Sequence, residues 1–281
     1  MEVLATIPEV RAARRSLTGE VGFVPTMGAL HAGHLSLVRE ARKANDAVFV
    51  SIFVNPTQFG PNEDYASYPR DLERDFQLLS QEGVDFVFTP SPAEMYPEGF
   101  DTWVDVRAVT ERLEGASRPG HFRGVATVVL KLLNIVQPAR AYFGRKDAQQ
   151  LVVVRKLVRD LDLDVEIVAV ETVREPDGLA MSSRNAYLSP EERKAAVVLW
   201  QALTLAREMW TRGTRDAAAF RSRMRELIED EPLARLDYVS VADPETLQEL
   251  DRIQGKALVS LAVHIGRTRL IDNVTLGEGA S

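Results

Sequence analysis

Residues 21–34 read VGFVPTMGALHAGH, and this stretch decides the fold that we expect. A short apolar strand over 21–24 ends at Pro25, and a helical pattern follows from about His34 to Ala44. A strand that leads through a glycine-containing loop into a helix is typical of a βαβ unit, from which parallel sheets are built.

Strand-like and helix-like segments alternate through the first two-thirds of the chain. Residues 47–54 (AVFVSIFV) form a nearly continuous apolar run, which is typical of a strand covered on both faces. Further strands are expected at 84–88, 141–143 and 165–173, and helices at 70–81, 125–136 and 148–161. In the first of these helices, Leu72, Phe76 and Leu79 form an apolar stripe.

Parallel sheets of this kind bind ligands beyond the carboxyl ends of their strands. The loops after Val24, Val54, Phe143 and Val173 should therefore hold the site, and each of them carries a cluster of polar residues.

The pattern changes after the turn at 176–178 (PDG). Ser189, Pro190 and Glu192 predict a capped helix that runs to about Thr211. A second helix is expected at about 215–229, followed by strands at 236–241, 257–265 and 269–274. We therefore predict an α/β chain with a parallel-sheet domain at 1–176 and a smaller α+β domain with an antiparallel sheet at 177–281.

The composition is that of a globular protein and excludes several kinds of site. Of the 281 residues, 45% are hydrophobic and 27% are charged, and there is no cysteine for a disulfide, a thiolate metal site or a thiol nucleophile. No apolar run approaches the ~20 residues that a membrane helix needs. The start of the sequence has no apolar signal core, so we expect a cytoplasmic protein without a membrane partner.

The net charge of −7 argues against a general nucleic-acid binder. A polyanionic ligand would therefore need local positive charge, and four cations stand near the motifs: Arg118, Arg123, Lys146 and Arg184.

The histidines of the opening stretch suit phosphate chemistry. Gly33 has no side chain, so a nucleotide can approach the backbone closely there. The start of a helix offers backbone N–H groups and a partial positive charge. His31 and His34 can donate hydrogen bonds to charge that grows on a reacting phosphate.

The segment PTMGALHAGHLSL (residues 25–37) resembles the pantothenate synthetases, a family in the wider nucleotidyltransferase superfamily. The resemblance extends in order to NPTQFGPNEDYASYPR (55–70), RPGHFRGV (118–125), YFGRKDAQQL (142–151) and LAMSSRNAYL (179–188), and is looser in the last third of the chain. It implies a Rossmann-like domain that binds nucleotide and pantoate, with the smaller domain as a lid. The sequence departs from the family at Arg145, where an acidic or amide side chain is more common.

The resemblance implies an ATP-dependent ligase that joins pantoate to β-alanine through a pantoyl-adenylate, releasing pyrophosphate and AMP. It implies catalytic roles for His31, His34, Lys146 and Arg184. The implied ATP-binding residues are Pro25, Thr26, Met27, Gly28, His34, Gly144, Lys146, Asp147, Val173, Met181, Ser182, Ser183 and Arg184.

The resemblance also places the second substrate. It implies that Asn55, Gln58, Gln150 and Met27 hold pantoate and that Gln58 also contacts β-alanine. Amide side chains, which both donate and accept, suit a substrate with hydroxyl groups. Asp75, Arg118 and His121 are further candidates; from the residues alone, Asp75 could equally lie on a solvated helix face and Arg118 in a rigid connector with an exposed cation.

The family likeness further suggests a homodimer. Mg²⁺ should bridge phosphate oxygens of ATP, held mainly by ATP and water, and its protein ligands stay unknown. Three other readings stay open: a nucleotidyltransferase that leaves the nucleotide on its product, a tRNA-charging enzyme, and a catalytically silent nucleotide-binding module. Their common requirement with the ligase is that segments distant in sequence meet around one nucleotide.

Overall fold

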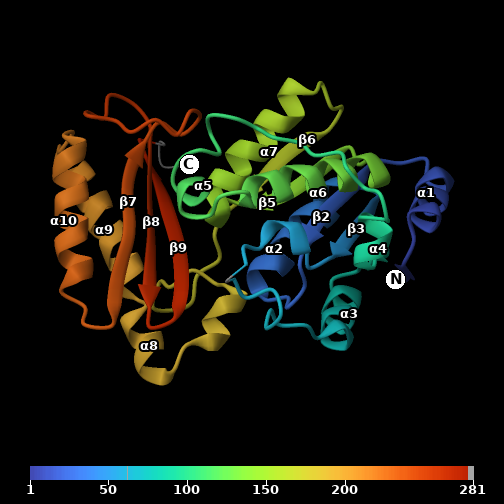
Figure 1. Cartoon of the computed structure of the whole chain (residues 1–281), viewed down its shortest axis with the longest axis horizontal. Coiled ribbons are helices and arrows are strands. Elements are labelled where there is room, and N and C mark those ends of the chain that lie inside the picture. Colours follow the sequence, from blue (N-terminus) through green and yellow to red (C-terminus); the bar gives the residue numbers. More distant parts are fainter. Residues whose placement is uncertain (62, 278–281) are drawn as a thin grey trace. The chain divides into compact units, whose positions relative to one another are not determined.

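The computed structural model describes residues 1–61 and 63–277, which group into two compact units (Figure 1). The first unit contains Met1–Arg145 and Gln150–Glu171, and the second contains Lys146–Gln149 and the chain from Thr172 onward. Each unit has a sheet of its own.

In the described residues of the first unit, a six-stranded sheet has the order β1-β4-β3-β2-β5-β6. Every neighbouring pair is parallel, which confirms the predicted sheet type. The strands are β1 (Glu2–Leu4), β2 (Val21–Thr26), β3 (Ala47–Ile52), β4 (Phe86–Phe88), β5 (Arg140–Gly144) and β6 (Glu166–Val170).

The centre of this sheet is covered on both faces. Every residue of β3 is buried, as the apolar run predicts. Val24, Val50 and Val87 from neighbouring strands share a cluster with Leu37 of α2 (Ala32–Ala44) and Leu79 of α3 (Leu72–Gln81).

The chain reverses its direction of winding between β2 and β5. From β2 it continues outward through β3 and β4, whereas β5 and β6 lie on the other side of β2. Such a switch point opens a crevice beyond the carboxyl ends of the two central strands. In this protein those ends are Thr26 and Gly144.

The remaining helical elements of the first unit differ in places from the sequence-based expectation. They are α1 (Ile7–Ser16), η1 (Pro56–Gln58), α4 (Pro92–Met95), α5 (Glu114–Ser117) and α6 (His121–Val136). After β5 come η2 (Arg145–Asp147) and α7 (Ala148–Asp160), of which Lys146–Gln149 belong to the second unit. Helix α6 starts at His121 rather than at residue 125, and β1 and α1 are additions to the predicted elements. Thr6 and Glu9 form a capping box that starts α1.

The expected apolar stripe of α3 is wrong at its first position. Leu72 is 45% exposed, whereas Asp75 is buried together with Leu79. The helix therefore turns the Asp75 carboxylate toward the interior.

The described residues of the second unit hold a three-stranded antiparallel sheet, as predicted. Its strands are β7 (Ala234–Ala242), β8 (Ala257–Ile265) and β9 (Thr268–Leu276), and its helical elements are η3 (Ser183–Tyr187), α8 (Pro190–Ala195), α9 (Val198–Thr211) and α10 (Ala217–Glu229). The predicted capping box of Ser189 and Glu192 is present.

The single helix expected from Ser189 to Thr211 is instead two helices. The hydrogen bonds tighten between them, where Val197 N donates to Lys194 O and Leu199 N donates to Ala196 O, each three residues back.

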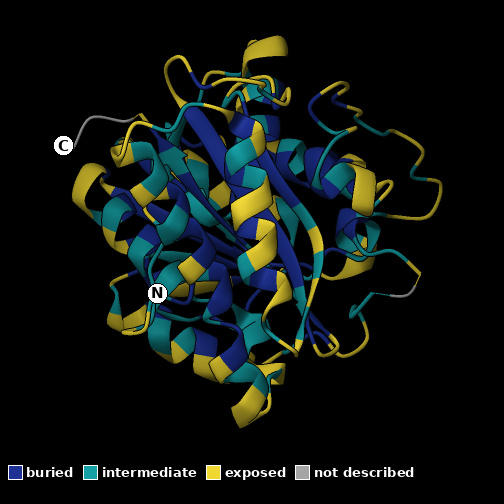
Figure 2. Cartoon of the chain, turned by 90° about the vertical axis from the view of Figure 1, so that its left-hand side faces the viewer, coloured by how far each residue is buried: buried dark blue, intermediate teal, exposed yellow. Residues whose placement is uncertain are grey.

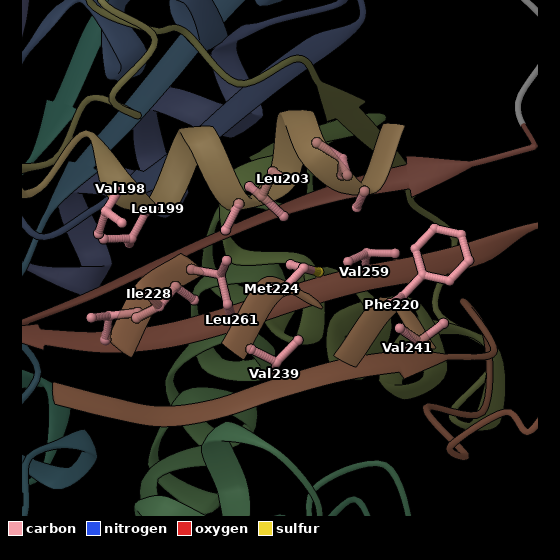
Figure 3. Close-up of a cluster of buried hydrophobic side chains, with 14 of the residues drawn as sticks. Val198, Leu199, Leu203, Phe220, Met224, Ile228, Val239, Val241, Val259 and Leu261 are labelled. Atoms are coloured by element: carbon pink, nitrogen blue, oxygen red, sulfur yellow. The ribbon is translucent and has the colours of Figure 1, made fainter. Parts of the chain in front are cut away.

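The core of this unit lies between helices and sheet. Leu203 of α9 and Phe220 and Met224 of α10 pack on Val259 and Leu261 of β8 (Figure 3). The strands are mostly buried, while the helices turn exposed faces outward (Figure 2). In the described part of the chain, no helix has both the length and the apolar character needed to cross a membrane.

Candidate active site

The loop after β2 is a turn held from outside by a carboxylate. Gly28 and Ala29 both adopt positive φ, at 80° and 51°. Asp75 accepts hydrogen bonds from the backbone N–H of Ala29 (2.9 Å) and of Leu30 (2.8 Å), so both of its oxygens hold the loop. A methyl group on Gly28 would lie 3.0 Å from Asp75 Oδ2. The turn therefore needs glycine for its backbone angle and for this close approach.

Asp75 is only 1% exposed, so the alternative of a solvated helix face is wrong. Burial raises the pKa of its carboxyl above the usual value, although the backbone hydrogen bonds from Leu30 and Ala29 oppose that effect. The residue acts on the loop that precedes the histidines, and its bonds to backbone explain why α3 buries it.

The two histidines are part of the start of α2. His31 is the residue that caps the helix, and its Nδ1 accepts from Gly33 N at 3.1 Å. His34 Nδ1 accepts in turn from His31 N at 3.4 Å, and the two rings lie with their centroids 4.1 Å apart. A ring nitrogen that accepts cannot carry a proton, so each neutral imidazole carries its proton on Nε2. Both rings are thus fixed as Nε2–H donors.

The loop after β3 places amide side chains against the loop after β2. Asn55 and Gln58 are buried at the short helix η1, and Asn55 Nδ2 donates to Gln58 Oε1 at 3.1 Å. Gln58 Nε2 lies 3.2 Å from Met27 Sδ. The structure therefore brings together Met27, Asn55 and Gln58, three residues that the family likeness assigns to pantoate.

Asn55 has further partners, of which Tyr96 lies outside the segments that carry the family likeness. Its Oδ1 accepts from Tyr96 OH at 2.9 Å and from Thr57 Oγ1 at 2.9 Å, and its Nδ2 donates to Gly124 O at 3.2 Å. Gly124 also allows α6 to approach η1, because a methyl group there would lie 2.4 Å from Thr57 O. Nothing in the sequence around Tyr96 marks this contact across the fold.

Arg118 and His121 brace the backbone of Gln58. Arg118 forms a two-pronged ion pair with Glu63, with Nε–Oε1 and Nη2–Oε2 both 2.6 Å, and its side chain is only 17% exposed. The alternative of an exposed cation is therefore wrong. His121 Nδ1 donates to Gln58 O at 2.8 Å, and its Nε2 accepts from Arg118 Nη1 at 3.2 Å. Although burial opposes it, the hydrogen bond and charge of Arg118 hold the pKa of Glu63 below its usual value.

His121 makes a testable contribution to stability in acid. Burial, and then the charge of Arg118, lower the pKa of His121 from 6.5 to about 4. The unfolded chain therefore takes up a proton between these values while the folded chain does not, so the free energy of unfolding falls as the pH falls from 6.5 to 4. The contribution is of the order of 3 kcal/mol.

We expect His121→Asn, which keeps a donor for Gln58 O, to flatten this pH dependence. Denaturant unfolding at pH 7 and pH 5 measures it in both proteins. An equal change in the free energy of unfolding between pH 7 and pH 5 in the variant and the parent would contradict the assignment of this pH dependence to His121.

The loop after β5 carries the next cluster. Gly144 ends β5, and Lys146 and Asp147 lie in η2. Lys146 Nζ lies 3.9 Å from Asp147 Oδ1, while the Lys146 carbonyl accepts from Asn273 Nδ2 at 2.8 Å. Arg145, the departure from the family pattern, pairs with Glu171 at 2.8 Å. Gln150 lies in the first turns of α7.

The segment from Met181 to Arg184 leaves a tight hairpin. Met181 N donates to Val173 O at 3.0 Å, and Arg174 and Ala180 form a β-bridge. Ser182 caps η3, with its hydroxyl accepting from Arg184 N at 3.2 Å. Ser182, Ser183 and Arg184 thus lie together at the start of one short helical turn.

Candidate residues therefore gather in two groups, each within one compact unit. The first unit holds the loops of the histidines and of the amides, together with Gly144 and Gln150. The second holds Lys146, Asp147, Val173 and the segment 181–184. Among the described residues, no group of three or more His, Asp or Glu side chains is arranged to hold a metal.

Comparisons with known proteins agree along the whole chain. The family model for pantoate-beta-alanine ligase matches residues 2–275. The pantothenate synthetase of Roseiflexus castenholzii is 62% identical over 276 residues, covering 98% of this chain and 99% of its own. That of Chloroflexus aurantiacus is 63% identical over 281 residues, covering 99% and 100%.

Solved structures give the same result. The crystal structure of pantothenate synthetase from Thermus thermophilus superposes with a TM-score of 0.94 at 53% identity, covering 98% of this chain and 99% of that one. A pantoate-beta-alanine ligase from Francisella tularensis, complexed with beta-gamma ATP and beta-alanine, gives 0.81 at 38% identity, with both chains fully covered at 100%. With a matching family model, near-complete coverage and the histidine loop at the sheet's switch point, the chain belongs to the pantoate–β-alanine ligases, the pantothenate synthetases.

Proposed function

We propose that this chain joins pantoate to β-alanine in two steps. The pantoate carboxylate attacks the α-phosphate of ATP, giving pantoyl-adenylate and pyrophosphate. The β-alanine amine then attacks the acyl carbon, giving pantothenate and AMP. The observation that carries the proposal is that His31 and His34 follow β2 at the switch point of the sheet, where β5 ends beside it at Gly144.

No protein nucleophile takes part, since the pantoate carboxylate fills that role. The chain instead contributes positioning and electrostatic stabilisation. We assign to His31 and His34 the donation of Nε2–H to oxygens that gain charge as pyrophosphate leaves. The hydrogen bonds to both Nδ1 atoms support this role, because they fix the tautomer that can donate from Nε2.

We assign the phosphate chain of ATP to Lys146 and Arg184. A lysine is a flexible point charge, whereas an arginine can bind two oxygens at once. Ser182, Ser183 and Met181 stand beside Arg184, and Asp147 beside Lys146 suits a ribose hydroxyl. Pro25, Thr26, Met27, Gly28, Gly144 and Val173 complete the proposed ATP contacts.

We assign pantoate to Asn55, Gln58, Gln150 and Met27, and β-alanine to Gln58. The packing of Gln58 against Met27 and Asn55 supports this grouping. We assign an indirect role to Asp75, Arg118 and His121. Their side chains bond to backbone and side-chain groups of the loops and would position the residues that bind substrate. We further propose that Mg²⁺ arrives with ATP, whose oxygens and water supply its ligands, and that the enzyme is a cytoplasmic homodimer.

A two-stage assay tests the function. With ATP, Mg²⁺ and pantoate alone, we expect pyrophosphate equal to one turnover per site. Addition of β-alanine should start continuous formation of AMP and pantothenate. Continuous turnover without β-alanine, with the nucleotide kept on the product, would identify a nucleotidyltransferase instead.

A further inference from the structure

Strand β9 carries two adjacent buried polar residues near its centre. Asp272 is 2% exposed and Asn273 is 9% exposed. Buried polar side chains need hydrogen-bond partners, and both residues find theirs on segments distant in sequence. Both partners belong to the second unit.

Asn273 holds the backbone of Lys146. Its Nδ2 donates to the Lys146 carbonyl at 2.8 Å, across a sequence separation of 127 residues. A lysine ammonium sits on a flexible side chain, so the position of its backbone limits how precisely the ammonium can be held near a ligand. Asn273 thereby ties Lys146 of η2 to the sheet of the second unit.

Asp272 holds the hairpin that leads into Met181. Both of its oxygens bind Arg174, at 2.6 and 3.0 Å, in a buried ion pair. Arg174 also donates to Gly178 O at 3.0 Å and stacks 4.0 Å above the ring of Trp200. The guanidinium is therefore fixed from three sides, and the hairpin with it.

The two residues also fix one another. Asp272 Oδ1 accepts from the backbone N–H of Asn273 at 2.8 Å, in addition to its bonds with Arg174. One point on β9 thus holds both segments to which we assign the phosphates of ATP.

We propose that Asn273 is a positioning residue for Lys146, and that Asp272 with Arg174 positions the segment from Met181 to Arg184. The proposal rests on the proposed function, because it takes Lys146 and this segment as the binders of ATP phosphates. Asn273 touches no substrate in this scheme; it acts through the Lys146 backbone.

A double-mutant cycle separates positioning from a general loss of structure. We expect Asn273→Ala to lower the single-turnover rate of pyrophosphate release roughly 10- to 100-fold, with an unchanged KM for pantoate. In a chain that already carries Lys146→Ala, the same change should cost less than about 3-fold, because residues that act as a unit are not additive.

Ser260 supplies a matched control. It pairs with Asn273 across β8 and β9, is buried, and its hydroxyl has no partner among the described residues. Ser260→Ala should keep the parent rate, and thermal unfolding of both variants shows whether either loses structure.

Two results would overturn the proposal: a parent-like rate for Asn273→Ala, or an equal fold-loss in the Lys146→Ala background. A parent-like rate for Lys146→Ala alone would instead remove the role of Lys146 in the proposed function, so the two failures are distinct.

Discussion

Lys146→Ala is expected to lower the rate of pyrophosphate release from ATP and pantoate by about 10²- to 10³-fold, while the fold stays intact. The ammonium is assigned to charge that develops on the phosphates, and nothing else in η2 can replace it, because Arg145 pairs with Glu171. Lys146 lies in a short helical turn and its side chain is not part of a core cluster, so thermal unfolding should change little.

Rapid-quench measurement of pyrophosphate in a single turnover checks this prediction. Lys156→Ala is the matched control, since Lys156 lies on the following helix and pairs with Asp160, at 2.6 Å, in an exposed contact. Release of pyrophosphate by Lys146→Ala at the parent rate would contradict the role.

Asp75→Asn is expected to have the second-largest effect, about 10²-fold on the same rate. Asparagine has the size of aspartate but only one acceptor oxygen, so the N–H of either Ala29 or Leu30 would face an amide donor. The unsatisfied group should also lower the free energy of unfolding by about 1–3 kcal/mol. Glu73→Gln, on the exposed face of the same helix, is the control.

The pH dependence of the parent protein gives a second check on Asp75. Because burial raises the pKa of Asp75, its contribution to the free energy of unfolding is fully present in acid and is lost as the pH rises through that pKa. The loop that Asp75 holds requires the ionised form, since only the carboxylate accepts hydrogen bonds from both N–H groups. Activity should therefore fall in acid at a higher pH than an aspartate of ordinary pKa would give, and this acid limb of the activity profile should vanish in Asp75→Asn.

The sequence predicts the parts of the fold that depend on local pattern. The apolar run of β3 and the Ser189 capping box appear as expected, because burial on both faces and helix capping each leave a signature within a few residues. The break between α8 and α9 has no glycine or proline to announce it. The apolar stripe of α3 fails at Leu72, which is exposed, while Asp75 is buried because a loop 45 residues away requires an acceptor.

The candidate site also has a part that local sequence pattern predicts and a part that it does not. The histidine and amide loops are identifiable from residue type and position after strands. Their supports are not, since Tyr96 reaches Asn55 across 41 residues and Asn273 reaches Lys146 across 127. A signal does exist for the latter: Asp272 and Asn273 stand between the apolar residues Ile271 and Val274 of β9, and adjacent polar side chains there are costly to bury without partners.

The capping of α2 by imidazoles has a consequence for how this enzyme can evolve. In most helices the residue that starts the helix can be exchanged among serine, threonine, asparagine and aspartate with little penalty. Here His31 and His34 use one ring nitrogen to begin the helix and keep the other for the proposed chemistry. Selection for folding and selection for turnover therefore act on opposite edges of the same two rings, and neither property can drift at these positions without the other.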